Sequence, residues 1–186
     1  MIEKLFTSKN RIKILGFLFF EKEESYIREI SNKTKVSPSA VKREVENLEK
    51  VGIFKREKNK VILNKESNIL DELKNIFIKT DYVVYPIKDS LKEIHAEFIL
   101  IFGSFARGDY KEGSDIDLLI IGRVKSFEVY KKIKPIENKI KREINCVVWT
   151  IENLKKEKNS GFVKDIFKKG VIMIKGEENE IRRIIG

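Results

Sequence analysis

The sequence predicts an α+β protein built in two parts, and two observations lead to that expectation. Residues 8–63 hold three apolar stripes with helical spacing, followed by two short strand-like runs. Further along, the apolar run 98–102 ends at Gly103-Ser104, and the apolar run 118–121 begins directly after Asp115-Ile116-Asp117. A part made of helices and then strands, beside a part whose strands end in polar residues, is typical of α+β chains.

Composition narrows the class of protein. At 186 residues the chain allows one or two small domains, and its 41% of hydrophobic residues is too high for a disordered chain. The net charge is +10, and the surplus of Lys and Arg lies in residues 1–67 and 97–176. Two basic blocks favour polyanionic partners. The alternative is the Lys/Glu-rich surface of a heat-adapted protein, whose charges form ion-pair networks.

Several classes of site and location are excluded by what the sequence lacks. Cys146 is the single cysteine and His95 the single histidine, so an internal disulfide or a thiolate zinc site is excluded. A Ser-His-Asp triad would have to use His95. No apolar stretch approaches the ~18 residues of a membrane span, and no signal peptide opens the chain. We therefore expect a cytoplasmic protein with no membrane partner.

Three helices are expected in the N-terminal part. The spacing of apolar residues predicts the first over 8–21. Ser25 is expected to cap the second, which ends at 32–34. Ser37-Pro38 is a stronger start signal, because a capping hydroxyl precedes a proline at the first helical position. That third helix is expected to end at Gly52.

Two short strands are expected after the third helix, at 53–56 and 61–63, around a basic polar turn. Three helices, the last two joined tightly, and a hairpin describe a winged helix-turn-helix domain, assigned to residues 1–67. Residues 8–66 resemble the winged-helix domains of prokaryotic transcription regulators, through the phrase from Ile27 to Phe54. The resemblance implies DNA binding, with groove contacts from Ser39, Lys42, Arg43 and Asn47 and phosphate contacts from Arg56, Lys58 and Lys60.

Alternatives to DNA binding stay open for this domain. Winged helices also serve as dimerisation or protein-docking modules, and Glu44, Glu46 and Glu49 on the third helix count against a groove contact. A winged helix that reads a palindrome would make the protein a homodimer. The next segment, 68–86, is expected to be a linker with a helix over 69–77, and Pro86 argues against a central strand there. The second domain is then 87–186, opened by a helix over 87–95.

The turn after the strand 98–102 has the features of a phosphate site. Gly103 permits close approach of the backbone to a ligand. Ser104 offers a hydroxyl, and a helix that opens at 104–106 offers free N–H groups that favour an anionic phosphate. Arg107 adds positive charge. We therefore expect nucleotide binding at Gly103, Ser104 and Arg107.

Asp115 and Asp117 are the candidate metal ligands and catalytic acids. Residues two apart on a strand project to the same face, so the two carboxylates are expected to lie together. Paired carboxylates can hold Mg²⁺ against a triphosphate. A solvated strand end beside a tight glycine turn is the plain structural alternative.

These residues resemble the signature of the DNA polymerase beta nucleotidyltransferase superfamily, most closely its minimal branch of small prokaryotic proteins. The resemblance covers about 87–176 and implies a mixed, mainly antiparallel sheet flanked by helices. It implies phosphate contacts from Gly103 and Ser104 and Mg²⁺ at Asp115 and Asp117. It also implies transfer of a nucleoside monophosphate from an NTP, with ATP expected, to a hydroxyl, with release of pyrophosphate.

One departure from the family concerns a third acid on the next strand, expected at 144–149 after a helix over 126–142 that Pro135 breaks or bends. The corresponding position holds Asn145, and an amide cannot act as a base at neutral pH. Glu143 has the same parity and is the candidate catalytic acid, although a surface ion pair beside Arg142 would explain it equally. Helices near 152–158 and 162–167 and a strand at 171–175 complete the expectation.

The leading hypothesis is a Mg²⁺-dependent nucleotidyltransferase coupled to a winged helix that binds DNA or a partner. A transcription regulator whose nucleotidyltransferase domain is inert and senses nucleotides is the alternative that Asn145 supports. The family resemblance adds a third, an antitoxin that modifies a partner toxin.

Overall fold

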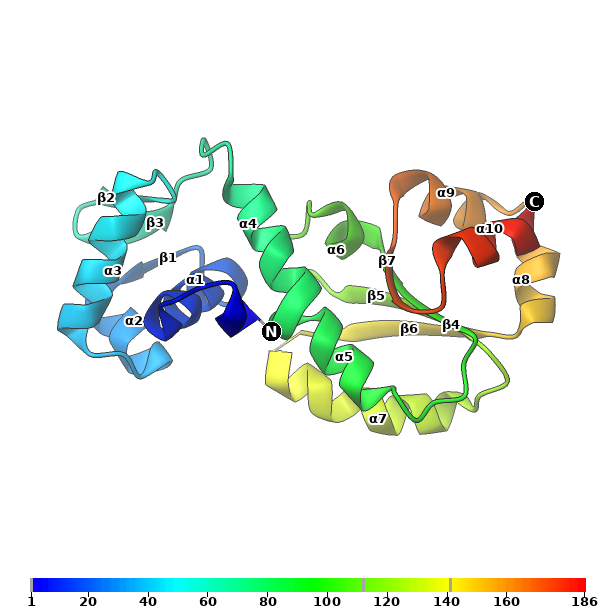
Figure 1. The fold of residues 1–186 in the computed structure, drawn as a ribbon. Coiled ribbons are helices and arrows are strands. Elements are labelled where there is room, and N and C mark those ends of the chain that lie inside the picture. The colour runs from blue at the N-terminus through cyan, green and yellow to red at the C-terminus, as the bar shows by residue number, and fades with distance from the viewer. Residues whose placement is uncertain (1, 112, 141) are drawn as a thin grey trace. The chain divides into compact units, whose positions relative to one another are not determined.

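The computed structural model describes residues 2–111, 113–140 and 142–186, and it shows a mixed α+β protein (Figure 1). The chain divides into two compact units, Met1–Asp81 and Tyr82–Gly186. Each unit has its own sheet, of three strands in the first and four in the second. The two units are described separately below.

The first unit has its helices before its hairpin. A short 3₁₀ turn, Ile2–Lys4, precedes helix α1, Lys9–Phe20, and helices α2, Ile27–Thr34, and α3, Pro38–Lys50. Strands β2, Phe54–Glu57, and β3, Lys60–Leu63, form the hairpin, and β3 also pairs with β1, Glu24–Tyr26. All pairings in this sheet are antiparallel, in the order β1-β3-β2. The three predicted helices and two predicted strands are confirmed to within about two residues at each end.

Helix α3 begins and ends where its local signals place it. The Ser37 side chain accepts a hydrogen bond from the Ala40 backbone N–H, and Pro38 occupies the first helical position. Val41 and Val45, four residues apart on one face, are fully buried in the core of the unit. Gly52 follows the helix with φ +79°, a conformation that glycine adopts without steric cost.

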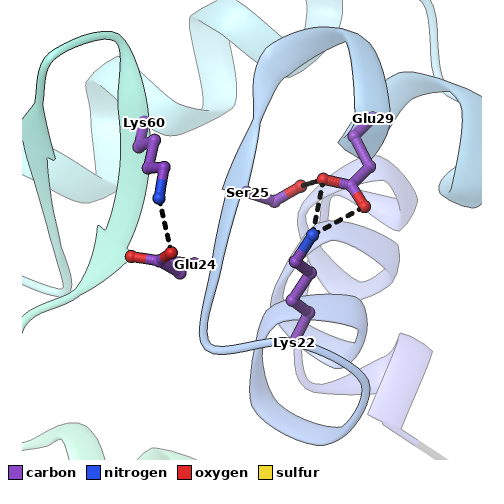
Figure 2. A network of polar contacts seen from close by, with 5 residues as sticks. All are labelled: Lys22, Glu24, Ser25, Glu29 and Lys60. Carbon is purple, nitrogen blue, oxygen red and sulfur yellow. Dashed lines mark hydrogen bonds and ion pairs between the residues drawn. The ribbon is translucent and has the colours of Figure 1, made fainter.

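Ser25 does not cap the second helix, contrary to the prediction. It lies in the middle of β1, opposite Val61 of β3, and the helix starts after Tyr26 with no side-chain cap. The Ser25 hydroxyl instead donates to Glu29 Oε2 at 2.6 Å, and Lys22 Nζ reaches the same carboxylate (Figure 2). Strand pairing with a segment 36 residues away overrides the local capping signal.

The segment before the second sheet is helical throughout most of its length. Helix α4, Leu70–Phe77, continues as a π-helical turn, Ile78–Tyr82, in which Thr80 leaves helical geometry and donates its hydroxyl to the Ile76 carbonyl at 2.7 Å. Helix α5, Val84–Ser90, opens the second unit. It starts and ends earlier than the predicted 87–95. The earlier start is possible because Pro86 then falls in the first turn, where a missing N–H costs nothing.

The second unit is built on a mixed sheet in the order β6-β5-β4-β7. Strand β4, Phe98–Phe102, is antiparallel to β5, Ile116–Ile121, and to β7, Ile172–Lys175, whereas β6, Ile144–Trp149, is parallel to β5. The helices of this unit are α6, Gly103–Arg107; α7, Ser126–Ile140; α8, Ile151–Glu157; α9, Gly161–Lys169; and α10, Glu178–Ile185. Pro135 lies inside α7 without ending it.

Alternate side chains along each strand point to opposite faces of this sheet, and each face is covered by a different set of helices. Leu100 of β4 and Leu119 of β5 are fully buried and pack in one cluster with side chains of α8, α9 and α10. Helices α5 and α7 contact each other and lie on the other side of the sheet (Figure 1). Asp117 has the same parity as Leu119, so its side chain leaves β5 on the α9 side.

Candidate active site

The turn between β4 and α6 is in direct contact with the second aspartate. Gly103 has φ +73°, in the region that favours glycine. A Cβ atom at this position would overlap Asp117 Oδ2 and lie 3.1 Å from Asp117 Cγ. Glycine is therefore required at residue 103 for two separate reasons, and the backbone turn lies against the Asp117 carboxylate.

Strand register brings three of the predicted positions side by side. Phe102, the last residue of β4, pairs with Asp117, and Asp117 pairs with Asn145 of β6. The Asn145 side-chain amide donates from Nδ2 to Asp115 Oδ2 at 3.2 Å. The phosphate-type turn, both aspartates and Asn145 thus meet at one edge of the sheet.

The electrostatics of the aspartate pair are unfavourable without a cation. Burial raises the pKa of the Asp117 carboxyl, and the negative charge of Asp115 raises it further. A hydrogen bond from Asn145 and the positive charge of Arg107 act in the opposite direction but do not cancel the rise. Two oxygen-donor side chains with a charge conflict between them suit a hard divalent cation such as Mg²⁺.

A third acid is not gathered at this edge. Within residues 2–111, 113–140 and 142–186, no group of three His, Cys, Asp or Glu side chains is placed to hold a metal ion. Glu143 is exposed just before β6; its backbone carbonyl accepts from the Ile116 N–H at 2.9 Å. The raised pKa of Lys134 on α7 comes mainly from its pair with Glu137, and the charge of Glu143 adds only the smallest contribution. The structure therefore brings Asn145, and not the Glu143 carboxylate, together with the aspartates.

The remaining predicted nucleotide contacts belong to α6. Ser104 is half-buried in its first turn, and its carbonyl accepts from Gly108 and Asp109 where the helix ends. Arg107 Nε donates to Asp109 Oδ2 at 3.0 Å. Its charge still lowers the pKa of Asp117, so the guanidinium lies near the site while held by Asp109.

Arg142 supports the loop that carries Asp115, and sequence reasoning gave it no role there. Its guanidinium donates to the Ser114 carbonyl at 3.0 Å and to the Lys111 carbonyl at 3.3 Å. It also lies 5.5 Å from the centre of the Phe105 ring, which stacks on Tyr110 at 4.5 Å. These contacts link the end of α6 to the start of β5. Nothing local in the sequence marks them, because they join positions about 30 residues apart.

A pocket of about 360 Å³ opens beside the Gly103 turn, on the α9 side of the sheet. Three of its lining residues, Phe162, Asp165 and Lys169, come from α9, and sequence reasoning did not assign them to the site. Their i, i+3, i+7 spacing was the available signal, since it places them on one face of a helix. The other lining residues are Phe102, Gly103, Arg107, Gly161 and Ile166.

The predicted DNA contacts are distributed over α3 and the hairpin of the first unit. Ser39, Lys42 and Arg43 are exposed on α3, and Asn47 is half-buried. Lys58 is at the hairpin tip with φ +45°. Two of the seven residues are held by acids: Arg56 Nε lies 3.0 Å from Glu49 Oε1, and Lys60 Nζ lies 2.6 Å from Glu24 Oε1 (Figure 2). Lys42 lies 4.0 Å from Glu46.

Glu44 on α3, one of the acids that were expected to count against a groove contact, is buried. It is 5% exposed and accepts hydrogen bonds from Ser8 Oγ at 2.6 Å and Arg11 Nε at 2.9 Å. It joins the start of α1 to α3 and adds no negative charge to the exposed face of α3.

The second unit is similar to known nucleotidyltransferases. The family model described as "Nucleotidyltransferase domain" matches residues 84–173, which include the turn, both aspartates and Asn145. The curated protein "Putative protein adenylyltransferase MJ0604" of Methanocaldococcus jannaschii is 37% identical over 75 residues, which are 40% of this chain and 75% of that protein. The chain belongs to the nucleotidyltransferase family. The resemblance to polymerase-beta-like nucleotidyltransferases is confirmed, and this nucleotidyltransferase is an enzyme.

Two solved structures align with part of this chain. A crystal structure described as "toxin-antitoxin with AMP-PNP" aligns with a TM-score of 0.43 and 13% identity over 55% of this nucleotidyltransferase and 81% of that chain. A mutant of the toxin–antitoxin MntA–HpeT aligns with a TM-score of 0.40 and 10% identity over 55% and 80%. Both scores are below 0.5, so these likenesses indicate no function here. Among the residues that the structure describes, no helix is long and apolar enough to cross a membrane.

Proposed function

We propose that the second unit transfers the AMP part of ATP to a hydroxyl group of a protein acceptor. The observation that supports this most directly is the fit of the Gly103 turn against the Asp117 carboxylate, because it puts a phosphate-binding backbone and a metal-type acid pair in contact. Adenylyl transfer, rather than transfer of another nucleotide, and a protein acceptor follow the name of the M. jannaschii relative. A toxin as that acceptor stays a prediction.

The reaction needs one bond made and one broken at the α-phosphorus. The acceptor hydroxyl oxygen bonds to the α-phosphorus, the bond from that phosphorus to the oxygen bridging to the β-phosphate breaks, and pyrophosphate leaves with the electron pair. The backbone at Gly103, the Ser104 hydroxyl and the Arg107 guanidinium would bind the phosphates. Asp115 and Asp117 would hold Mg²⁺, which supplies positive charge against the triphosphate.

The proton of the acceptor hydroxyl needs a base, and Glu143 is the candidate that the sequence offers. Its carboxylate is not gathered with Asp115 and Asp117 in the structure, so this role rests on the sequence alone. Asn145, at the usual position of the third acid, cannot take a proton. Replacing Glu143→Gln should lower the transfer rate about 100-fold if Glu143 is that base. Asn145→Asp is the companion change: it should tighten Mg²⁺ binding by adding a third carboxylate. If Glu143→Gln transfers at the wild-type rate, Glu143 has no catalytic role.

The proposed activity is tested with purified full-length protein, Mg²⁺ and ATP labelled on the α-phosphate, with and without cell extract as a source of acceptor. Label should appear on protein with wild type and be lost with Asp115→Asn and Asp117→Asn. Asp89→Asn is the matched control, since Asp89 is exposed and pairs with Lys92, which is also exposed. Absence of label transfer from ATP by the wild-type chain would rule out the proposal, and transfer from another NTP instead would contradict its adenylyl part.

For the first unit, we infer a winged helix-turn-helix domain over residues 1–67 that binds duplex DNA, with 68–86 as the joint to the catalytic domain 87–186. The order of helices, strand and hairpin supports the domain type. The exposed Arg43 supports a groove contact, and the exposed Lys58 supports a phosphate contact. Protein docking and homodimer formation stay predictions for this unit.

A further inference from the structure

The pocket between α9 and the Gly103 turn combines an aromatic wall with a ring of charges. Phe162 of α9 forms edge-type contacts with Phe102 and with Trp149, in both cases with ring centres 5.5 Å apart. These contacts hold the ring, yet 40% of the Phe162 side chain remains exposed. An aromatic ring fixed by its neighbours and open on one side is suited to stack on a flat ligand.

The charges at the pocket alternate between bases and acids. Lys169 Nζ lies 2.7 Å from Asp165 Oδ2, and Arg107 Nε lies 3.0 Å from Asp109 Oδ2. Arg107 and, more weakly, Lys169 lower the pKa of Asp109, so the two cations act on the same place from α6 and α9. The Lys169–Asp165 pair is about half exposed, and the Arg107 side chain is about one-third exposed beside a more exposed Asp109; ion pairs open to solvent contribute little to stability. Each cation can therefore leave its carboxylate for a stronger anion at little cost.

We propose that this pocket is the nucleotide site, in which Phe162 stacks on the base and Lys169, with Arg107, binds the triphosphate after releasing its carboxylate partner. The inference rests on the proposed transfer function and assigns it three residues of α9. A triphosphate carries several negative charges against one on each carboxylate, so it outcompetes Asp165 for Lys169. Asp165 is then a built-in competitor that lowers nucleotide affinity when it pairs with Lys169.

The ligand class follows from the chemistry of the walls and from their position. The aromatic face accepts a planar base, and the two cations accept phosphate oxygens. The Gly103 turn belongs to the same pocket lining, beside the Asp117 carboxylate. A nucleoside triphosphate presents all three features in one molecule. The volume of about 360 Å³ lies in the usual range of small-molecule sites.

The test measures the dissociation constant of Mg²⁺-ATP for full-length protein by calorimetry, with the fluorescence of Trp149, the single tryptophan of the chain, as a local signal. Lys169→Met should raise the constant at least about tenfold, because a charge-assisted contact is lost. Phe162→Ala should raise it about tenfold through lost stacking. Asp165→Asn should lower it about two- to fivefold, since the competitor is removed.

Lys168→Met is the matched control, because Lys168 is the neighbouring exposed lysine on α9 and does not line this pocket. Its affinity for Mg²⁺-ATP should equal that of wild type. Wild-type affinity in both Lys169→Met and Phe162→Ala would overturn the inference and leave the proposed transfer intact. The transfer function is decided separately, by whether label transfer is lost in Asp115→Asn and Asp117→Asn. A wild-type chain that binds no NTP would overturn both.

Discussion

Gly103 satisfies two requirements at a single position: a left-handed backbone and room for the Asp117 carboxylate. We expect Gly103→Ala to cost about 1–2 kcal/mol of folding stability through the backbone alone. The larger effect should fall on activity, since the added methyl group displaces Asp117 and such a shift can cost about 100-fold in rate. Label transfer at saturating ATP and the free energy of unfolding measure the two effects.

Gly113→Ala separates the two causes. Gly113 has φ +80°, but nothing lies within 4 Å of a Cβ atom placed there. The Gly113→Ala variant should lose about as much folding stability as Gly103→Ala and retain most of its activity. Equal loss of activity in the two variants would show that backbone strain, and not the contact with Asp117, explains the effect.

The Asp117 carboxylate is expected to lower the folding stability of the metal-free protein. Its pKa in the folded state lies above the ordinary aspartate value, mainly through burial and next through Asp115. A raised carboxyl pKa favours the protonated folded state, so the metal-free protein loses stability as the pH rises from the unfolded-state pKa through the folded one. Asp117→Asn removes this loss.

Thermal unfolding without divalent metal should therefore give Asp117→Asn a higher Tm than wild type at pH 7, and the difference should shrink as the pH approaches 4. Adding Mg²⁺ should raise the Tm of wild type and leave that of the variant nearly unchanged. A lower Tm for Asp117→Asn at pH 7 would contradict the electrostatic account.

At the scale of elements, the α1–α3 junction depends on a buried glutamate. Burial raises the pKa of Glu44, but the hydrogen bonds from Ser8 and Arg11 and the nearby arginine charges together outweigh it, so the pKa is lowered. Glu44→Gln should cost about 1–3 kcal/mol, the usual value of hydrogen bonds to a charged group. A lowered pKa gives stability that is present above the unfolded-state value of about 4.3 and is lost as the pH falls through the folded value.

Urea unfolding followed by helical circular dichroism at pH 7 and pH 4 measures this difference, which should be smaller at pH 4. Glu46→Gln on the same helix is the control. Its ion pairs with Lys42, at 4.0 Å, and Arg56, at 3.9 Å, are both long and open to solvent, so its effect should stay within about 0.5 kcal/mol. Equal effects of the two variants would contradict a special role for the buried carboxylate.

Elements with local signals could be predicted from the sequence, and elements set by distant pairing could not. Helix α3 has its cap and its stop within its own residues, so its bounds are accurate. Strand β1 escaped prediction because only pairing with β3 defines it, and Ser25 was misread as a cap. Helix α10 was missed as well; in it, only Ile181 is buried and charged residues fill most other positions.

The candidate site shows the same division. Gly103, Asp115 and Asp117 could be found because a glycine-serine turn that ends one apolar run and paired acids that begin the next stand in a telling order along the sequence. The α9 residues of the pocket could not, since an exposed aromatic and a Lys–Asp pair occur on many solvated helices. Only the packing of α9 on the α6 side of the sheet places them beside the turn.

At the scale of the whole molecule, the net charge of +10 favours a polyanionic partner. The ion pairs of the protein indicate which of its cations can contact that partner. Arg56 and Lys60 are held by Glu49 and Glu24, whereas Arg43 and Lys58 are exposed. We expect duplex DNA binding to depend on the second pair. The double variant Arg43→Ala/Lys58→Ala should weaken binding and flatten its dependence on salt, by about two in the slope of log affinity against log salt concentration.

Full-length protein and a labelled duplex at 50–200 mM salt, a range over which such contacts are sensitive, provide the measurement. Arg56→Ala is the matched control and should change the slope by less than about one, because Glu49 already neutralises the guanidinium. Label transfer from ATP should be unchanged in the double variant, since the exchanged residues lie outside the catalytic unit. If the wild type has no affinity for duplex DNA at 50 mM salt, the basic surface of the first unit serves another partner, and protein docking becomes the function to test.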